Sequence, residues 1–173
     1  MKTEYLLQRE VDLVLAAMTR ENRLVMRVAL TTGLRIGDVL RLETKKLQPH
    51  FWITEQKTGK RRQIGLPEPL LSDLRKVAGK RWVFEGRDDP NKHRTRQAVW
   101  KDIKRAARAF RLPQNIAPHS ARKVYAVELM EKYGDIERVQ RALNHCNPAV
   151  TLVYAMADRE LKANARRRGR KRS

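Results

Sequence analysis

The spacing of apolar residues changes within this chain of 173 residues, and that change limits the folds it can adopt. Before residue 42 and after residue 67, apolar residues recur at the three-to-four-residue spacing of amphipathic helices. Between them, two short extended runs flank the turn Lys57-Thr58-Gly59-Lys60, as in a β-hairpin. The pattern therefore predicts an α+β fold, mainly α-helical with one small antiparallel β-sheet.

The expected helices can be bounded from their apolar faces and from residues that start or stop helices. Gly33 is expected to end the second helix, and Asp135 and Asn147 are expected to cap two later ones. The face of the 95–110 helix that includes Phe110 is expected to be buried, and so are the three tryptophans, Trp52, Trp82 and Trp100. The predicted helices cover 8–18, 22–32, 36–41, 67–78, 95–110, 119–132, 136–144 and 148–157, and the hairpin strands cover 50–56 and 61–66.

The chain carries a formal net charge of +20, with 39 Lys and Arg against 19 Asp and Glu. Residues 159–173 contribute +7 of this charge, so the remaining residues still carry +13. A positive field of this size favours a polyanionic partner, most often nucleic acid. The single cysteine excludes a disulfide within the chain, and no apolar run approaches the length of a membrane span. We therefore expect a cytoplasmic protein with no membrane partner.

Six polar side chains at the predicted helix junctions and the hairpin turn suit a reaction at a phosphodiester. Arginine forks bind the non-bridging oxygens of a phosphoryl transition state, and lysine or histidine can move protons. A tyrosine hydroxyl becomes a nucleophile when a base or cations lie beside it. Because these cations are side chains, we expect neither a metal nor another cofactor. The six residues are Arg35, Lys57, His119, Arg122, His145 and Tyr154.

These residues stand in four sequence boxes whose order and spacing resemble the catalytic domain of the tyrosine recombinase (phage integrase) family. The first box is Thr32-Gly33-Leu34-Arg35-Ile36-Gly37-Asp38-Val39-Leu40-Arg41-Leu42, and the second is Lys57-Thr58-Gly59-Lys60, followed by a basic strand that ends at Gly65-Leu66-Pro67. The third is Pro118-His119-Ser120-Ala121-Arg122, and the fourth is Leu143-Asn144-His145 with Tyr154 nine residues later. Ala121, Lys123 and Asn144 depart from the residues that the family often has there, but none of them replaces one of the six.

The resemblance implies a role for each residue. Tyr154 would attack a DNA phosphate and form a 3′-phosphotyrosyl bond. Arg35, Arg122 and His145 would bind the transition-state oxygens. Lys57 would protonate the leaving 5′-oxygen, and His119 would help to remove the tyrosine proton. Asp38 would support the site indirectly, by orienting an arginine.

The implied function is site-specific DNA recombination, by integration, excision or inversion, with double-stranded DNA as partner and protomers that self-associate into a tetrameric synapse. No small-molecule substrate is expected. Further DNA contacts are expected from basic residues of the hairpin, the 95–110 helix and the tail. They are Lys60, Arg61, Arg62, Arg96, Lys101, Lys104, Arg105, Arg166, Arg167 and Arg168.

Three other interpretations share some of these features. A type IB topoisomerase would use the same chemistry to relax DNA, a DNA-binding module would keep the fold without catalysis, and a basic RNA-binding protein would explain the charge alone. We expect the catalytic domain to cover residues 1–158 and a C-terminal helix with a basic tail to cover 159–173. The family's N-terminal core-binding domain is not expected in this chain, which is either an excised catalytic domain or a compact protein.

Overall fold

A computed structural model describes residues 8–112 and 116–143 of the chain. It contains the predicted mixture of helices with one two-stranded antiparallel sheet. The helices predicted over 148–157 and after residue 158 lie outside the described residues. In chain order the elements are α1 (Gln8–Ala17), α2 (Arg20–Thr32), α3 (Ile36–Leu40), a 3-10 turn η1 (Thr44–Lys46), β1 (His50–Thr54), β2 (Arg61–Gly65), α4 (Glu68–Arg75), α5 (Arg96–Ala109), α6 (Pro118–Tyr133) and α7 (Ile136–Leu143).

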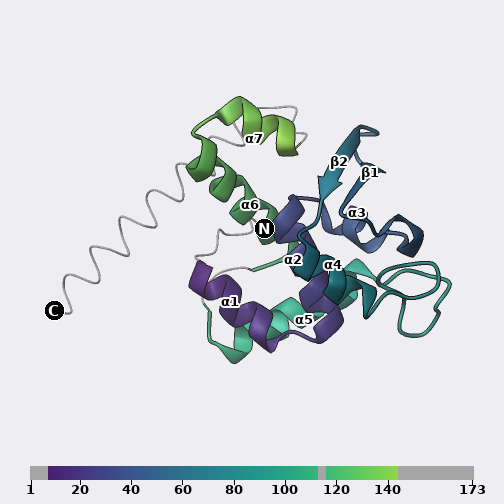
Figure 1. Ribbon diagram of the computed structural model, residues 1–173. Helices are drawn as coiled ribbons and strands as arrows, with labels where there is room; N and C mark the ends of the chain where they lie inside the picture. Colours follow the sequence, from purple (N-terminus) through teal and green to yellow (C-terminus); the bar gives the residue numbers. More distant parts are fainter. Residues whose placement is uncertain (1–7, 113–115, 144–173) are drawn as a thin grey trace.

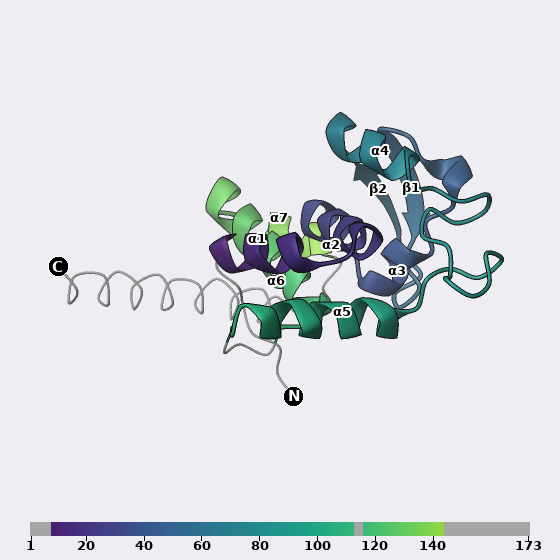
Figure 2. The same ribbon diagram turned by 90° about the horizontal axis from the view of Figure 1, so that it is seen from below.

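Helix α2 is the centre of the fold, because it packs against five other helices: α1, α3, α4, α5 and α6 (Figure 1). The hairpin, α3 and α4 gather at one end of the molecule, and α5 runs along one side beneath α1 (Figure 2). Helix α6 leads away from α2 and carries α7 at its far end (Figure 1). As predicted, Gly33 ends α2 in the left-handed conformation, and the Asp135 side chain accepts hydrogen bonds from the first amides of α7.

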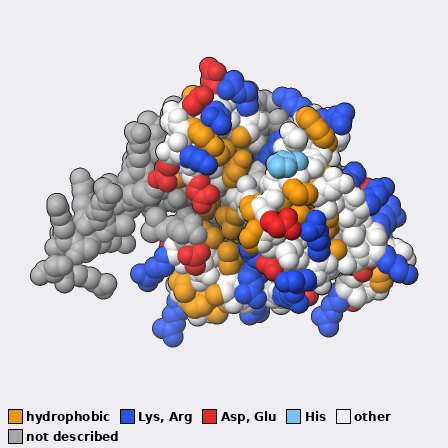
Figure 3. Space-filling view, in the orientation of Figure 1, with side chains coloured by type: hydrophobic (Ala, Val, Ile, Leu, Met, Phe, Trp, Pro, Cys, Tyr) orange, Lys and Arg blue, Asp and Glu red, His pale blue; other side chains and the backbone are white. Residues whose placement is uncertain are grey.

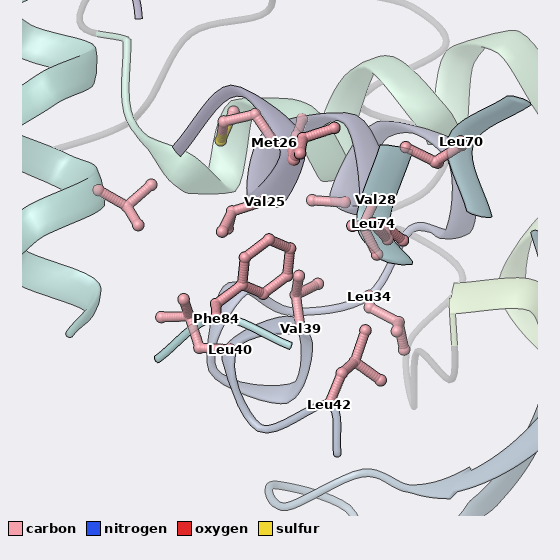
Figure 4. Packing of buried hydrophobic residues seen from close by; sticks show 14 of the residues in the cluster. Val25, Met26, Val28, Leu34, Val39, Leu40, Leu42, Leu70, Leu74 and Phe84 are labelled. Carbon is pink, nitrogen blue, oxygen red and sulfur yellow. The ribbon is translucent and has the colours of Figure 1, made fainter. Parts of the chain in front are cut away.

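Part of the core lies between α2, α3, α4 and the segment that follows α4 (Figure 4), and the same cluster continues onto α1, the hairpin, α5 and α6. The ring of Phe84 occupies its middle, between Val25 of α2 and Val39 and Leu40 of α3. The Phe84 segment is held in place because the backbone amide of Val83 donates to the carbonyl of Leu42 at 2.9 Å. This core fixes α3 against the end of α2, and it thereby positions the polar residues between the two helices.

The hairpin pairs His50 with Gly65 and Thr54 with Arg61. Phe51, Ile53 and Ile64 face the protein interior, as the alternation of apolar residues predicted. The turn closes through Gly59, at φ +66°, whose amide donates to the carbonyl of Glu55 at 2.8 Å. Glu55 therefore continues the inward-facing side of β1 beyond the end of the strand.

The prediction that the tryptophans are core residues was wrong for two of them. Trp52 is 53% exposed because it alternates with the inward Phe51 and Ile53, and the Arg61 guanidinium lies 5.3 Å from its ring. Trp100 is 45% exposed on the outer side of α5. Phe110 was also wrongly assigned to the buried face of α5, since it follows the last residue of that helix and is 40% exposed. No helix in the described part of the chain is both long and apolar enough to cross a membrane.

Candidate active site

Arg35 stands at the sharp junction between α2 and α3. Gly33 ends α2 at φ +64°, and Arg35 then adopts an extended conformation just before α3. Its carbonyl accepts hydrogen bonds from the amides of Asp38 and Val39, so its backbone is fixed by the first turn of α3. The Arg35 side chain is one-fifth exposed, and its Nη1 lies 2.5 Å from Oε2 of Glu55. One arginine of the predicted set is thus held at the surface by a buried carboxylate.

Arg122 lies on α6 and is almost entirely buried. Its two Nη groups donate to the carbonyls of Gly33, at the end of α2, and Leu143, at the end of α7. Burial and the neighbouring charges of Arg35 and Arg62 lower its pKa to about 10, against the opposing effect of Glu55 and Asp38. The guanidinium therefore remains charged near pH 7, and it ties together the chain segments on either side of the site.

Lys57 occupies the exposed tip of the hairpin turn. A hydrogen bond to α3 holds the turn in place, because the amide of Gln56 donates to Oδ1 of Asp38 at 3.0 Å. Asp38 thus orients the loop that carries the lysine, whereas the carboxylate in contact with the Arg35 guanidinium is that of Glu55. The expectation that Asp38 orients an arginine is corrected in this respect.

His119 is the second residue of α6, where it is exposed, and it lies about one turn before Arg122. Partial desolvation by the surrounding protein lowers its pKa, and the positive charges of Arg122, Lys123, Arg35 and Lys57 lower it further. These charges show that residues far apart in the sequence converge at this point. A histidine with a lowered pKa is neutral at pH 7 and can accept a proton.

The predicted set is therefore brought together in part. Arg35, Lys57 and Arg122 come from the start of α3, the hairpin turn and α6, and all three lie near enough to His119 for their charges to lower its pKa. His145 and Tyr154 lie outside the described residues, and the described chain ends its α7 at Leu143, whose carbonyl is bound by Arg122.

The predicted DNA-binding residues occupy different environments. Lys60 and Arg61 are exposed on the hairpin, and Arg96 and Lys101 are exposed along α5. Arg105 is also largely exposed but pairs with Asp102 at 2.6 Å, and the Lys104 ammonium lies 5.7 Å from the Trp100 ring. Basic side chains dominate the edge of the molecule that holds the hairpin (Figure 3). Arg166, Arg167 and Arg168 lie outside the described residues.

Arg62 differs from the expectation of a surface contact with DNA. Its guanidinium points inward and donates to the carbonyls of Thr32 and Ala142, and its Nη1 lies 3.6 Å from Oε1 of Glu55. Burial lowers its pKa. Arg62 turns inward because carbonyls of α2 and α7 and the Glu55 carboxylate supply the acceptors that water or phosphate would supply to an exposed arginine.

Sequence reasoning missed Glu55, which has no exposed side-chain surface. The alternation of Phe51 and Ile53 as inward residues was the signal, because its next inward position is 55. A carboxylate at an inward position requires partners, and two arginines and the Thr58 hydroxyl supply them. Within residues 8–112 and 116–143, no group of three or more His, Cys, Asp or Glu side chains is arranged to hold a metal ion.

Comparison with known proteins decides the family. The sequence profile of the phage integrase family matches residues 4–160, which is most of the chain. The chain belongs to the phage integrase family. The resemblance seen in the four sequence boxes is thereby confirmed.

Individual members of the phage integrase family show the same similarity. A probable integrase/recombinase of Bacillus subtilis, YoeC, is 28% identical over 87% of this chain and 86% of its own length. The integrase of Escherichia phage P2 is 31% identical over 89% of this chain, which spans only 43% of that protein. A lambda integrase fragment, solved as a dimer bound to a core site, has a TM-score of 0.75 at 20% identity and covers 90% of this chain and 60% of its own. The predicted α+β catalytic-domain fold is thus confirmed.

Proposed function

We propose that this chain is a site-specific recombinase that breaks and rejoins double-stranded DNA through a 3′-phosphotyrosyl intermediate. The observation that carries this proposal is the convergence of Arg35, Lys57, His119 and Arg122 from three separate segments of the fold. Three cations and a histidine with a lowered pKa match the needs of a phosphodiester that gains negative charge as it reacts.

The proposed reaction is an exchange of one phosphate ester for another. The hydroxyl oxygen of Tyr154 attacks the phosphorus, and the bond to the 5′-oxygen breaks. His119 accepts the tyrosine proton, while Lys57 donates a proton to the departing oxygen. Arg35, Arg122 and His145 bind the non-bridging oxygens. A 5′-hydroxyl from a second strand then attacks the phosphotyrosyl bond and restores a DNA phosphodiester.

The proposed partners are double-stranded DNA and further copies of the chain. Lambda integrase has been solved as a tetramer bound to a Holliday junction, and this structure shares its fold with a TM-score of 0.74. By analogy we propose that four protomers assemble on two DNA sites, in the cytoplasm and on the nucleoid. Residues 1–158 would form the catalytic unit and 159–173 the basic tail.

Covalent trapping tests the reaction directly. The chain is mixed with a random-sequence pool of nicked duplexes, from which a cleaved short strand diffuses away, and denatured protein–DNA adducts are isolated and sequenced. We expect adducts from the wild type and none from Tyr154→Phe, with DNA affinity nearly unchanged. A shared sequence among the captured strands supports a recombinase, whereas random sequences indicate relaxation by a topoisomerase-like activity. Tight binding by both proteins without adducts would contradict the catalytic proposal.

Arg35→Ala tests the arginine roles at a side chain that is partly exposed, whereas Arg122 is buried and binds two backbone carbonyls. We expect Arg35→Ala to slow adduct formation at least 100-fold, the usual cost of removing a preorganised donor. Arg27→Ala is the matched control, since Arg27 pairs with Asp73 elsewhere on the molecule at 2.8 Å. A tenfold effect or less for Arg35→Ala would count against its assignment.

A further inference from the structure

Glu55 is a buried carboxylate enclosed by cations. Its side chain has no exposed surface, and Oε2 lies 2.5 Å from Nη1 of Arg35. Oε1 lies 3.6 Å from Nη1 of Arg62, and the Thr58 hydroxyl donates to Oε2 at 3.2 Å. Removing a carboxylate from water is strongly unfavourable unless partners replace the hydration. A carboxylate in this position therefore requires the two arginines to stay where they are.

The second arginine gives this arrangement a rigid base. Arg62 donates to the carbonyl of Thr32 at the end of α2 and to the carbonyl of Ala142 near the end of α7. Through Glu55, the Arg35 guanidinium is thus linked to two helix ends rather than to a flexible surface group. The link also offsets the mutual repulsion of Arg35, Arg62 and Arg122, which crowd the same region.

The geometry leaves Arg35 able to bind a second anion. A guanidinium carries five N–H donors in a fixed plane, and the contact with Glu55 engages Nη1. Holding one nitrogen fixes the direction of the others, and one-fifth of the Arg35 side chain is open to solvent. This is the arrangement of a guanidinium oriented from behind so that its outer edge meets a phosphate.

We propose that Glu55 is a positioning residue that orients Arg35 toward the non-bridging oxygens of the scissile phosphate. This inference rests on the proposed function and deepens it, because it assigns the orientation of the reacting arginine to a residue outside the six predicted ones. Its effect belongs to the transition state, in which the oxygens gain charge, more than to the binding of intact DNA.

The test is Glu55→Gln, which keeps the shape of the side chain and removes its charge. We expect the single-turnover rate of phosphotyrosyl formation on nicked duplexes to fall at least tenfold. The dissociation constant for the same DNA, measured in a Tyr154→Phe background, should change by less than about twofold, because a few tenths of a kcal/mol is small beside a tenfold effect. Asp73→Asn is the matched control, as it removes one carboxylate from another arginine pair and should leave both values unchanged.

Two further measurements keep the inference open to refutation. In an Arg35→Ala background, Glu55→Gln should have little additional effect on the rate. Rotation of the Arg35 guanidinium, followed by 15N NMR in the DNA-free protein, should be slow in the wild type and faster in Glu55→Gln. If Glu55→Gln fails to fold, Glu55→Asp replaces it, because it keeps the charge but shortens the side chain, and we expect slower adduct formation and faster guanidinium rotation than in the wild type.

The outcomes separate this inference from the proposed function. An unchanged rate in Glu55→Gln, or a parallel loss of rate and affinity, would overturn the positioning role while the adducts themselves uphold the proposed chemistry. If the wild type forms no adducts, the proposed function fails, and the NMR measurement still decides whether Glu55 orients Arg35. Equal guanidinium rotation in wild type and Glu55→Gln would then reject the inference.

Discussion

Gly33 both ends α2 and binds a residue of the candidate site. It ends α2 at φ +64°, and its carbonyl accepts a hydrogen bond from Arg122. A Cβ atom there would lie 2.2 Å from the Tyr125 ring, whereas one at Gly134, at φ +65°, would meet nothing within 4 Å. Gly33→Ala should therefore lower the free energy of unfolding by about 1–3 kcal/mol more than Gly134→Ala, since overpacking adds to the shared backbone strain. Urea unfolding measures both values, and equal losses would contradict the close packing of Tyr125.

His119 gives a pH dependence with a definite sign. Its pKa in the folded protein lies below the ordinary value, because of partial desolvation and the cations around it. Below a pH of about 6.5 the unfolded chain therefore binds the proton more readily, and the folded state loses stability as the pH falls toward the lowered pKa. We expect the free energy of unfolding to fall more between about pH 7.5 and 5.5 in the wild type than in His119→Gln. Parallel curves for the two proteins would show that folding does not lower the pKa of His119.

At the scale of elements, Arg62 and Arg122 connect the end of α2 to the end of α7. Each arginine donates one hydrogen bond to a carbonyl at the end of α2 and one to a carbonyl at the end of α7. Helix α7 is therefore attached to the site by charge-assisted hydrogen bonds as well as by apolar packing. Arg62→Leu removes half of these bonds and should increase amide hydrogen exchange in residues 136–143 at least severalfold. Arg141→Leu is the control on the same helix, because Arg141 is exposed and pairs with Glu137 at 3.7 Å. Equal exchange in both variants would mean that Arg62 does not anchor α7.

The elements were largely predictable from sequence, because helical spacing and strand alternation leave local signals. Gly33 and Asp135 marked helix ends for the same reason. The inward turn of Arg62 was not predictable, since it depends on carbonyls 30 and 80 residues away. Trp52 and Trp100 were predicted to be buried because they are hydrophobic, but their positions in the strand and the helix face solvent. The sequence boxes thus named Arg35 and Arg122 as candidate site residues, whereas the Glu55 carboxylate between Arg35 and Arg62 was found only in the tertiary structure.

At the scale of the whole molecule, positive charge is spread well beyond the candidate site. The chain has a net charge of +20, and the last eight residues hold six of its basic groups. In the part that the structure describes, Lys and Arg also line the edge formed by the hairpin and the loop before α5 (Figure 3). Affinity for DNA should therefore have a large component that is independent of sequence and sensitive to salt.

Deleting residues 166–173 separates this component from the chemistry. Each phosphate neutralised on B-DNA contributes about −0.9 to the slope of log K against log salt concentration. Loss of the six basic groups should therefore make the slope shallower by up to about 5 and weaken binding at low salt. At saturating protein the rate of adduct formation should stay unchanged, because the reacting residues are intact. A variant with all six replaced by glutamine is the control for chain length and should match the deletion. An unchanged slope would show that the tail does not contact phosphate, and the described basic edge would then have to account for the affinity.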